Sequence, residues 1–273
     1  MTTLQKTIKY LAMAFAIFLT VSIISGMISV IALFGGFSMG DAVTEDMKTY
    51  SVSTEIHNLN IEISVADLYI KEGGAFSVES NLKNIKVDDS NGKLTVKDLT
   101  KNKLFNGGAY ETAVLTIYVP TGTVFDNVNI VTGAGRLTVD NLSAETIDFE
   151  LGAGEVSIGS LVATKSADID GGAGRITVSD GALENLDMDM GVGELNLTSA
   201  FSGECKLDLG VGESNITLIG NKDDYKLDVE KGLGSISVDG KSVYDFGSSG
   251  RNKVEISGGI GAINIRFREA KIK

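Results

Sequence analysis

The sequence predicts an all-β protein, a parallel β-solenoid (single-stranded β-helix) with about 19–20 residues per turn, preceded by one transmembrane α-helix. Three observations predict this fold. A Gly-apolar-Gly triplet recurs seven times, apolar and polar residues alternate on both sides of each triplet, and an uncharged stretch runs from Tyr10 to Gly40. The first two indicate stacked strands, and the third indicates a membrane span.

The repeat is marked by pairs of glycines with one apolar residue between them. Successive first glycines are 19, 20, 19, 19, 22 and 27 residues apart, which is typical of a solenoid that repeats one unit per winding. The glycines are Gly133, Gly135, Gly152, Gly154, Gly172, Gly174, Gly191, Gly193, Gly210, Gly212, Gly232, Gly234, Gly259 and Gly261. We interpret them as structural corners, because glycine adopts positive φ and lets neighbouring main chain approach closely.

Each corner is flanked by two predicted strands. The residues five and three positions before the first glycine are apolar in every repeat, as in Ile147 and Phe149, and charged residues stand beside them in the second to sixth repeats. The residues four and six positions after it are apolar with the exception of Ser214, and a small polar residue separates them. This alternation predicts strand, corner, strand and a polar return, in a strongly specified stacking register.

The first 49 residues predict a membrane anchor. Residues 1–9 are basic and are expected in the cytoplasm, and residues 10–40 are long enough to cross a bilayer. Lysines before the span and acidic residues after it predict a single-pass protein whose C-terminal domain lies outside the cell membrane. A cleaved signal peptide is the alternative, but it has a shorter apolar region. Residues 41–49 are predicted to be a polar tether.

The rest of the chain divides into a cap, a regular coil and a tail. Residues 50–126 alternate like strands without regular glycine pairs, and Pro120 fits the end of a strand. We predict that this irregular β region is the N-terminal cap of the solenoid. Residues 127–268 form the regular repeats, the last of which is charged and is expected to end the stack, and residues 269–273 form a basic tail.

The sequence as a whole resembles a known protein family. An N-terminal span, a β-rich region that ends in Ile117–Gly122, and repeated strand, Gly-x-Gly, strand units are similar to the bacterial putative-adhesin family of β-solenoid domains, which includes Lia-type (LiaG-like) envelope-stress proteins. The resemblance covers about residues 50–268. It implies a β-solenoid and a role at the cell envelope, and it implies no catalytic residues.

Several chemistries are excluded or disfavoured by the residues present. The glycine pairs lack the third glycine of a dinucleotide fingerprint and the Gly-Lys-Ser/Thr of a P-loop, so we predict no nucleotide and no cofactor. The best match to a calcium β-roll, Gly171–Ile176, carries isoleucine where an aspartate ligand belongs. His57 is the only histidine and Cys205 the only cysteine, which disfavours a catalytic Cys-His pair and excludes a metal site made of several histidines. A net charge of −12 disfavours nucleic acid.

The one candidate interaction face is a column of carboxylates two positions before the corner glycines. We call it the acidic ladder, and its members are Glu150, Asp170, Asp189, Asp208 and Glu230. Stacked strands would place neighbours about 4.8 Å apart. The ladder is either a solvated face or a site for a cation or a cationic peptide. A third alternative is a polysaccharide-cleaving β-helix enzyme, because paired carboxylates at such spacing can hydrolyse glycosides.

The sequence therefore predicts no enzyme. We expect a non-enzymatic surface-interaction or cell-envelope stress-response module, whose partner is an envelope protein, a cell-wall component or a cationic peptide.

Overall fold

The computed structural model describes residues 44–52, 55–99, 112–230, 232–242 and 250–269. The predicted N-terminus (1–9), the predicted span (10–40) and residues 270–273 of the predicted tail lie outside these residues. Among the residues described, there is no helix with the length and apolar character needed to cross a bilayer.

The described chain is all-β, as predicted, with two short 3-10 turns. The turns are Ser90–Gly92 and Lys222–Asp224. The strands are β1 (Thr44–Ser51), β2 (Asn58–Gly73), β3 (Ser77–Leu82), β4 (Ile85–Asp88), β5 (Lys93–Asp98), β6 (Val114–Pro120), β7 (Phe125–Val178), β8 (Gly181–Glu184), β9 (Leu186–Ser202), β10 (Glu204–Ile219), β11 (Tyr225–Glu230), β12 (Leu233–Val238), β13 (Lys241–Ser242) and β14 (Asn252–Arg268).

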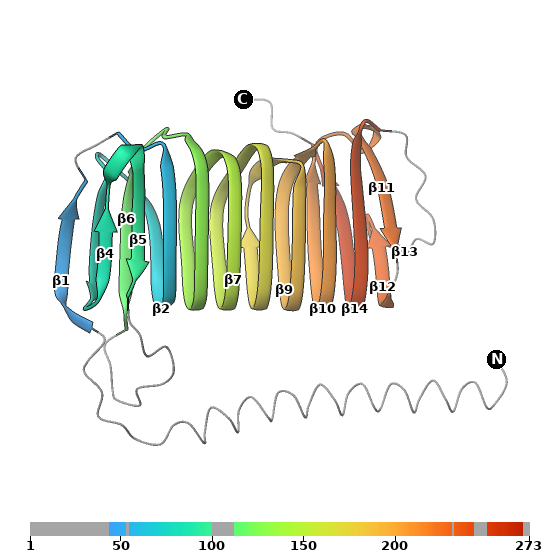
Figure 1. Cartoon of the computed structure of the whole chain (residues 1–273). Coiled ribbons are helices and arrows are strands. Elements are labelled where there is room, and N and C mark those ends of the chain that lie inside the picture. Colours follow the sequence, from blue (N-terminus) through green and yellow to red (C-terminus); the bar gives the residue numbers. More distant parts are fainter. Residues whose placement is uncertain (1–43, 53–54, 100–111, 231, 243–249, 270–273) are drawn as a thin grey trace, which may run out of the picture. The chain divides into compact units, whose positions relative to one another are not determined.

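The middle of the molecule is a coil of stacked parallel windings (Figure 1). β7 runs through three of them without a break, and β9 and β10 continue the stack. Gly174 stands opposite Gly193, and Gly193 stands opposite Gly212, so the corners of successive windings lie in one column. The predicted apolar columns on both sides of the corners point inward, with Ile147, Phe149 and Ile158 at 2% exposure or less. The core therefore runs along the axis of the coil.

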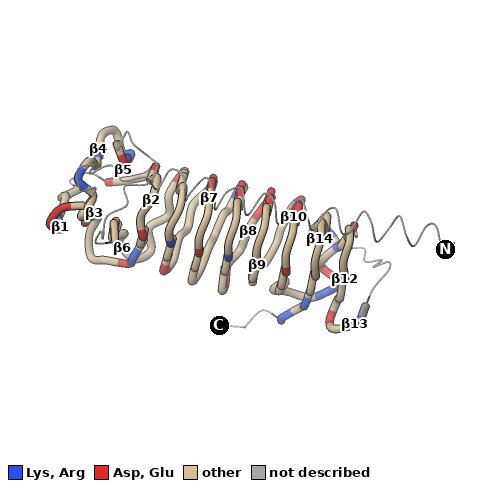
Figure 2. The backbone as a smooth tube through the Cα atoms, turned by 90° about the horizontal axis from the view of Figure 1, so that it is seen from below, with Lys and Arg blue, Asp and Glu red and all other residues tan. Residues whose placement is uncertain are grey.

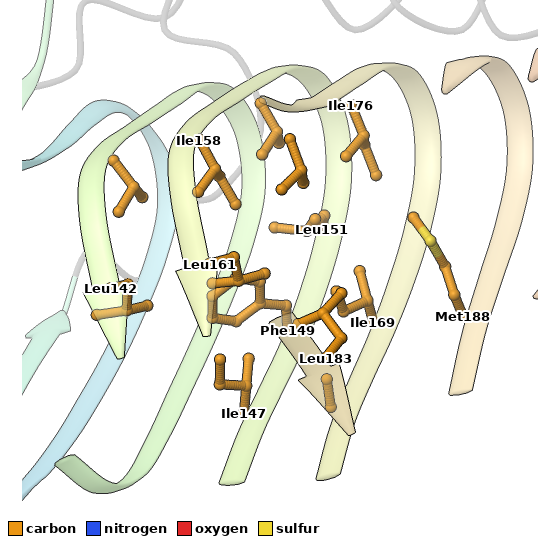
Figure 3. Close-up of a cluster of buried hydrophobic side chains, with 14 of the residues drawn as sticks. Leu142, Ile147, Phe149, Leu151, Ile158, Leu161, Ile169, Ile176, Leu183 and Met188 are labelled. Carbon is orange, nitrogen blue, oxygen red and sulfur yellow. The ribbon is translucent and has the colours of Figure 1, made fainter. Parts of the chain in front are cut away.

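The return between windings is a third apolar side, which the sequence analysis wrongly predicted to be polar. Leu142, Leu161, Leu183 and Phe201 all lie on this segment and are buried. Figure 3 shows the first three among the core residues that come from the strands. Leu183 on β8 stands opposite both Ala163 and Phe201 of the neighbouring windings. The core is thus enclosed on three sides, and each winding buries more apolar surface than the two predicted strands provide.

The last two windings stack in the reverse of their sequence order. β14 pairs with β10 along one edge, and with β11 and β12 along the other. Gly212 therefore stands opposite Gly261, and Gly234 lies beyond it. The prediction that the final repeat ends the stack was wrong, because β11 and β12 form the outer winding.

A row of hydrogen-bonded side chains, which we call the amide ladder, follows the reversed order of the last two windings. The Asn215 amide donates to Asn196 at 3.1 Å, the Asn264 amide donates to Asn215 at 3.0 Å, and the Ser237 hydroxyl donates to Asn264 at 2.9 Å. Stacking in sequence order would place Ser237 between two asparagines and interrupt the row of amides. The observed order keeps the three asparagines together, and it gives β14 main-chain partners on both edges.

The N-terminal end of the stack has a matching arrangement. β2 forms a complete winding against the first part of β7, with Ala66 in the place of a corner glycine. β5 and β6, which follow β2 in sequence, pair with its other edge and form the outer winding. At both ends, therefore, the winding nearest the chain terminus lies second in the stack. The predicted cap at 50–126 thus contributes two windings.

Antiparallel strands cover this outer winding, so the sheet is mixed rather than purely parallel. β3 pairs with β6, β4 pairs with β5, and β1 pairs with β3. Thr44–Thr49 were predicted to belong to a tether, and they instead form most of β1. Because β1 adds its own row of hydrogen bonds to β3, this part of the chain belongs to the folded domain.

Candidate interaction surface

The acidic ladder projects from the strand that leads into each corner. Asp170 stands opposite Asp189, and Asp189 stands opposite Asp208 on the next winding. Figure 2 shows acidic positions gathered in rows along the stack. A second acidic column lies two residues earlier on the same strands, where Asp168 stands opposite Asp187. Alternation places both columns on the outer face, since the residues between them fill the core.

The ladder is interrupted near its C-terminal end. Ser257 of β14 stands opposite both Asp208 and Glu230, so these two carboxylates are not neighbours. This corrects the predicted run of five adjacent carboxylates. Its cause is the inserted β14, which carries serine at this position.

Carboxylates in the middle of the face repel one another. Partial burial raises the pKa of Asp168, and the charges of Asp170 and Asp148 raise it further. Partial burial also raises the pKa of Asp189, with an added effect of Asp208. In contrast, a hydrogen bond from the Lys206 ammonium group lowers the pKa of Asp208. Neighbouring carboxylates therefore add to the effect of burial at Asp168 and Asp189, whereas Lys206 partly neutralises the charge at Asp208.

The surface beside the ladder is shallow. An open groove of about 330 Å³ is lined by Glu150, Asp170 and Asp189 together with corner backbone around Gly152 and Gly172. Within the described ranges, no three histidine, cysteine, aspartate or glutamate side chains are arranged to hold a metal ion. The face thus offers evenly spaced carboxylates along an open surface.

The single histidine and the single cysteine are not brought together. His57 lies just before β2, and its main chain bonds to Gly92 and Asp126. Cys205 is buried on β10, several windings away, where its thiol contacts the Ser202 carbonyl at 3.5 Å. Burial raises the pKa of the Cys205 thiol, which disfavours the reactive thiolate.

A row of alternating charges lies on the other side of the corners. We call it the mixed row, and its members are Asp67, Arg136, Glu155, Arg175, Glu194 and Glu213. Arg136 bonds to Asp67 at 2.8 Å. Arg175 contacts Glu194 at 2.9 Å and Glu155 at 3.5 Å. These cross-winding ion pairs neutralise much of the row. Because Arg175 is shared by Glu155 and Glu194, and Glu213 follows them, the C-terminal end of the row keeps a net negative charge.

The chain matches a known protein family over most of its described residues. The sequence model of the Toastrack DUF4097 family matches residues 51–266. The chain belongs to the Toastrack DUF4097 family. This confirms the predicted family relationship, whereas the narrower Lia-type likeness stays a prediction. No curated protein is similar enough to the chain to count as a relative.

Several solved structures are similar to this Toastrack chain. A putative cell adhesion protein from Clostridium sporogenes has 16% identity and a TM-score of 0.38, covering 82% of this chain and 99% of its own. A putative adhesin from Bacteroides fragilis has 14% identity and a TM-score of 0.39, covering 83% and 100%. A putative lipid binding protein from Parabacteroides distasonis has 16% identity and a TM-score of 0.34, covering 83% and 98%.

The Toastrack corners also carry an exposed apolar row that the sequence analysis did not single out. We call it the corner row. In stacking order its members are Val65, Ala134, Ala153, Ala173, Val192, Val211, Ile260 and Leu233. The five larger side chains are 41% to 65% exposed. The residue between the paired glycines is apolar in every repeat, and this signal could have predicted the row.

Proposed function

We propose that this Toastrack protein is a non-enzymatic interaction module at the cell envelope, which binds a cationic partner through its acidic face. The observation that carries the proposal is the even, open arrangement of the acidic ladder and its neighbouring column. Burial and, after it, the neighbouring carboxylates raise the pKa values of Asp168 and Asp189, so a bound cationic group would relieve the repulsion among these carboxylates. The columns set no carboxylate pair apart in a cleft, which argues against the polysaccharide-cleaving alternative.

Peptide binding tests this proposal. The full-length chain, held in lipid nanodiscs, should bind a 20-residue lysine-rich peptide, and binding should weaken at high salt because the carboxylates face water. The triple variant Asp168→Asn/Asp170→Asn/Asp189→Asn should bind about tenfold more weakly, as expected for the loss of three exposed charges. Empty nanodiscs provide the background signal.

The matched control removes three exposed carboxylates that lie elsewhere. Glu55→Gln/Asp126→Asn/Asp223→Asn removes the same number of negative charges and should leave the affinity nearly unchanged. If both triple variants weaken binding to the same extent, then overall charge rather than the acidic face attracts the peptide, and the assignment of the face is wrong.

We further propose that residues 10–40 anchor the domain to the cell membrane by a single span, with residues 1–9 in the cytoplasm. The uncharged length of this stretch and the lysines before it support the proposal. Ser179→Cys, at an exposed position, should react with a membrane-impermeant maleimide on intact cells. Thr3→Cys should react only after lysis. Labelling of both positions on intact cells would contradict this orientation.

In this location the module would serve surface interaction or the response to envelope stress. Its partner would be a cationic peptide, an envelope protein or a cell-wall component.

A further inference from the structure

We propose that the partner is an amphipathic, cationic α-helix that lies lengthwise along the corner row. This inference rests on the proposed function, and it adds the shape of the partner and its position on the domain. The corner row would contact the apolar stripe of the helix, and the acidic residues on both sides would contact its lysines and arginines.

The corner row is the apolar centre of the proposed site. Val192, Val211, Ile260 and Leu233 occupy four consecutive windings, and each is at least 41% exposed. A glycine lies on each side of every one of them, so no neighbouring side chain covers the row. Continuous exposed apolar surface of this kind marks an interaction site more often than scattered single residues do.

Charge complementarity identifies the class of partner. Asp189 and Asp208 lie three residues before Val192 and Val211, about 10 Å away along an extended chain. Glu194 and Glu213 lie two residues after the same valines, about 7 Å away on the other side. At these two windings the apolar row has carboxylates on both sides, of which Asp208 also pairs with Lys206 and Glu194 with Arg175. This arrangement fits a helix that has a hydrophobic stripe and cationic flanks. The same carboxylates would repel a surface of lipid phosphates.

The dimensions also fit a helix. Windings repeat about every 4.8 Å, and a helix advances about 5.4 Å per turn, so each helical turn meets about one winding. The mismatch of about 0.6 Å per step amounts to about 4 Å over the eight windings, which is less than one step. The row spans about 34 Å, which matches a helix of about 22 residues. A helix with side chains is about 10–12 Å wide, and extended lysines would reach the acidic rows.

Two peptides of identical composition test the inference on the full-length chain in nanodiscs. The first is a 22-residue leucine–lysine peptide with its leucines in one helical stripe, and the second disperses the same leucines around the helix. The striped peptide should bind about tenfold more tightly, since it alone can bury apolar side chains on the corner row. Val192→Ser/Val211→Ser should abolish this preference. Val124→Ser/Met47→Ser, which changes exposed apolar residues outside the row, should retain it.

The outcomes separate the inference from the proposed function. If both peptides bind equally and the aspartate variants weaken both, the inference is overturned and the acidic face stands. If neither peptide binds, both proposals are wrong. A dye on Val211→Cys should be accessible to an aqueous quencher before the striped peptide is added and protected afterwards. Protection by the nanodisc lipid before peptide addition would overturn the inference, because the row would then rest on a membrane.

Discussion

At the scale of single residues, the corner glycines decide how closely the windings stack. Gly193 has a φ of 149°, and a side chain on it would overlap the carbonyl oxygen of Gly174 on the preceding winding. Both the backbone conformation and the lack of space therefore require glycine. The same contact recurs along the column, where a side chain on Gly212 would overlap the Gly193 carbonyl oxygen. In the corner column the backbones of successive windings are in close contact, and any residue larger than glycine would push the windings apart.

Alanine at a corner should therefore destabilise the whole coil. We expect Gly193→Ala to lower the free energy of unfolding by about 3 kcal/mol or more, through backbone strain and the clash with Gly174. The control is Gly74→Ala, because a side chain there meets nothing within 4 Å. Its effect should stay within about 0.5 kcal/mol. Similar urea denaturation midpoints for the two variants would show that the corner does not need glycine.

At the scale of elements, β14 determines how the stack ends. It follows β11 and β12 in sequence, yet it lies between them and β10. A side-chain hydrogen bond joins Asn264 of β14 to Asn215 of β10, and main-chain hydrogen bonds join the two edges of β14 to β10 and β12. The outer winding that remains carries Lys226, Asp228 and Glu230, whose charges disfavour pairing with another strand.

Engineered disulfides should reveal the order of these elements. Asn215 and Asn264 are Cα partners on adjacent strands, so Asn215→Cys/Asn264→Cys should form a disulfide on mild oxidation. Asn215→Cys/Ser237→Cys should not, because those residues lie two strands apart, at about 10 Å. Buried Cys205 should stay unreacted in both variants. Mass spectrometry distinguishes the outcomes, and the reverse pattern would mean that the windings stack in sequence order.

At the scale of the whole molecule, the net charge of −12 is distributed unevenly. The mixed row pairs several of its charges through Arg136 and Arg175. The acidic columns around Asp168 and Asp189 instead gather charges of one sign. Self-repulsion of such a face favours solubility and weakens the fold, and both effects depend on salt and pH.

This imbalance predicts how stability depends on pH. Because folding raises the pKa values of Asp168 and Asp189, the folded state binds more protons, and their ionisation destabilises it as pH rises. Asp168→Asn or Asp189→Asn should therefore raise the Tm at pH 7 by roughly 1 °C, a small effect because these groups contact water. The gain should shrink as pH falls through the raised folded-state pKa values and vanish well below about pH 4, where the carboxyls are protonated in both states.

Asp208→Asn is the matched control for this prediction. Folding lowers the pKa of Asp208 through its hydrogen bond from Lys206, so its ionised form stabilises the fold at pH 7. Its replacement should lower the Tm at that pH. Thermal scans at several pH values measure all three variants, and a rise for Asp208→Asn equal to the others would contradict the role of the local environment.

The candidate site could be predicted from the sequence only in part. The positions of Asp170 and Asp189 relative to the corners follow from alternation along each strand, so their shared outer face was accessible from the pattern. The interruption of the acidic ladder at Ser257 could not be predicted in this way, because it arises from a strand that is distant in sequence. The corner row was visible as an invariably apolar residue between glycines, but its exposure depends on the direction of the bend.

The sequence by itself determined the winding, its register and its inward columns. A period of 19 or 20 residues with alternating apolar residues leaves one way to bury them, and a slip of one residue would expose every one. Only the tertiary structure decided the order of windings at the two ends and the third buried side. All windings present the same columns, so local pattern cannot distinguish β10–β14 from β10–β12 pairing. That choice depends on the amide ladder, the longer connections and the edge strand that each order leaves exposed.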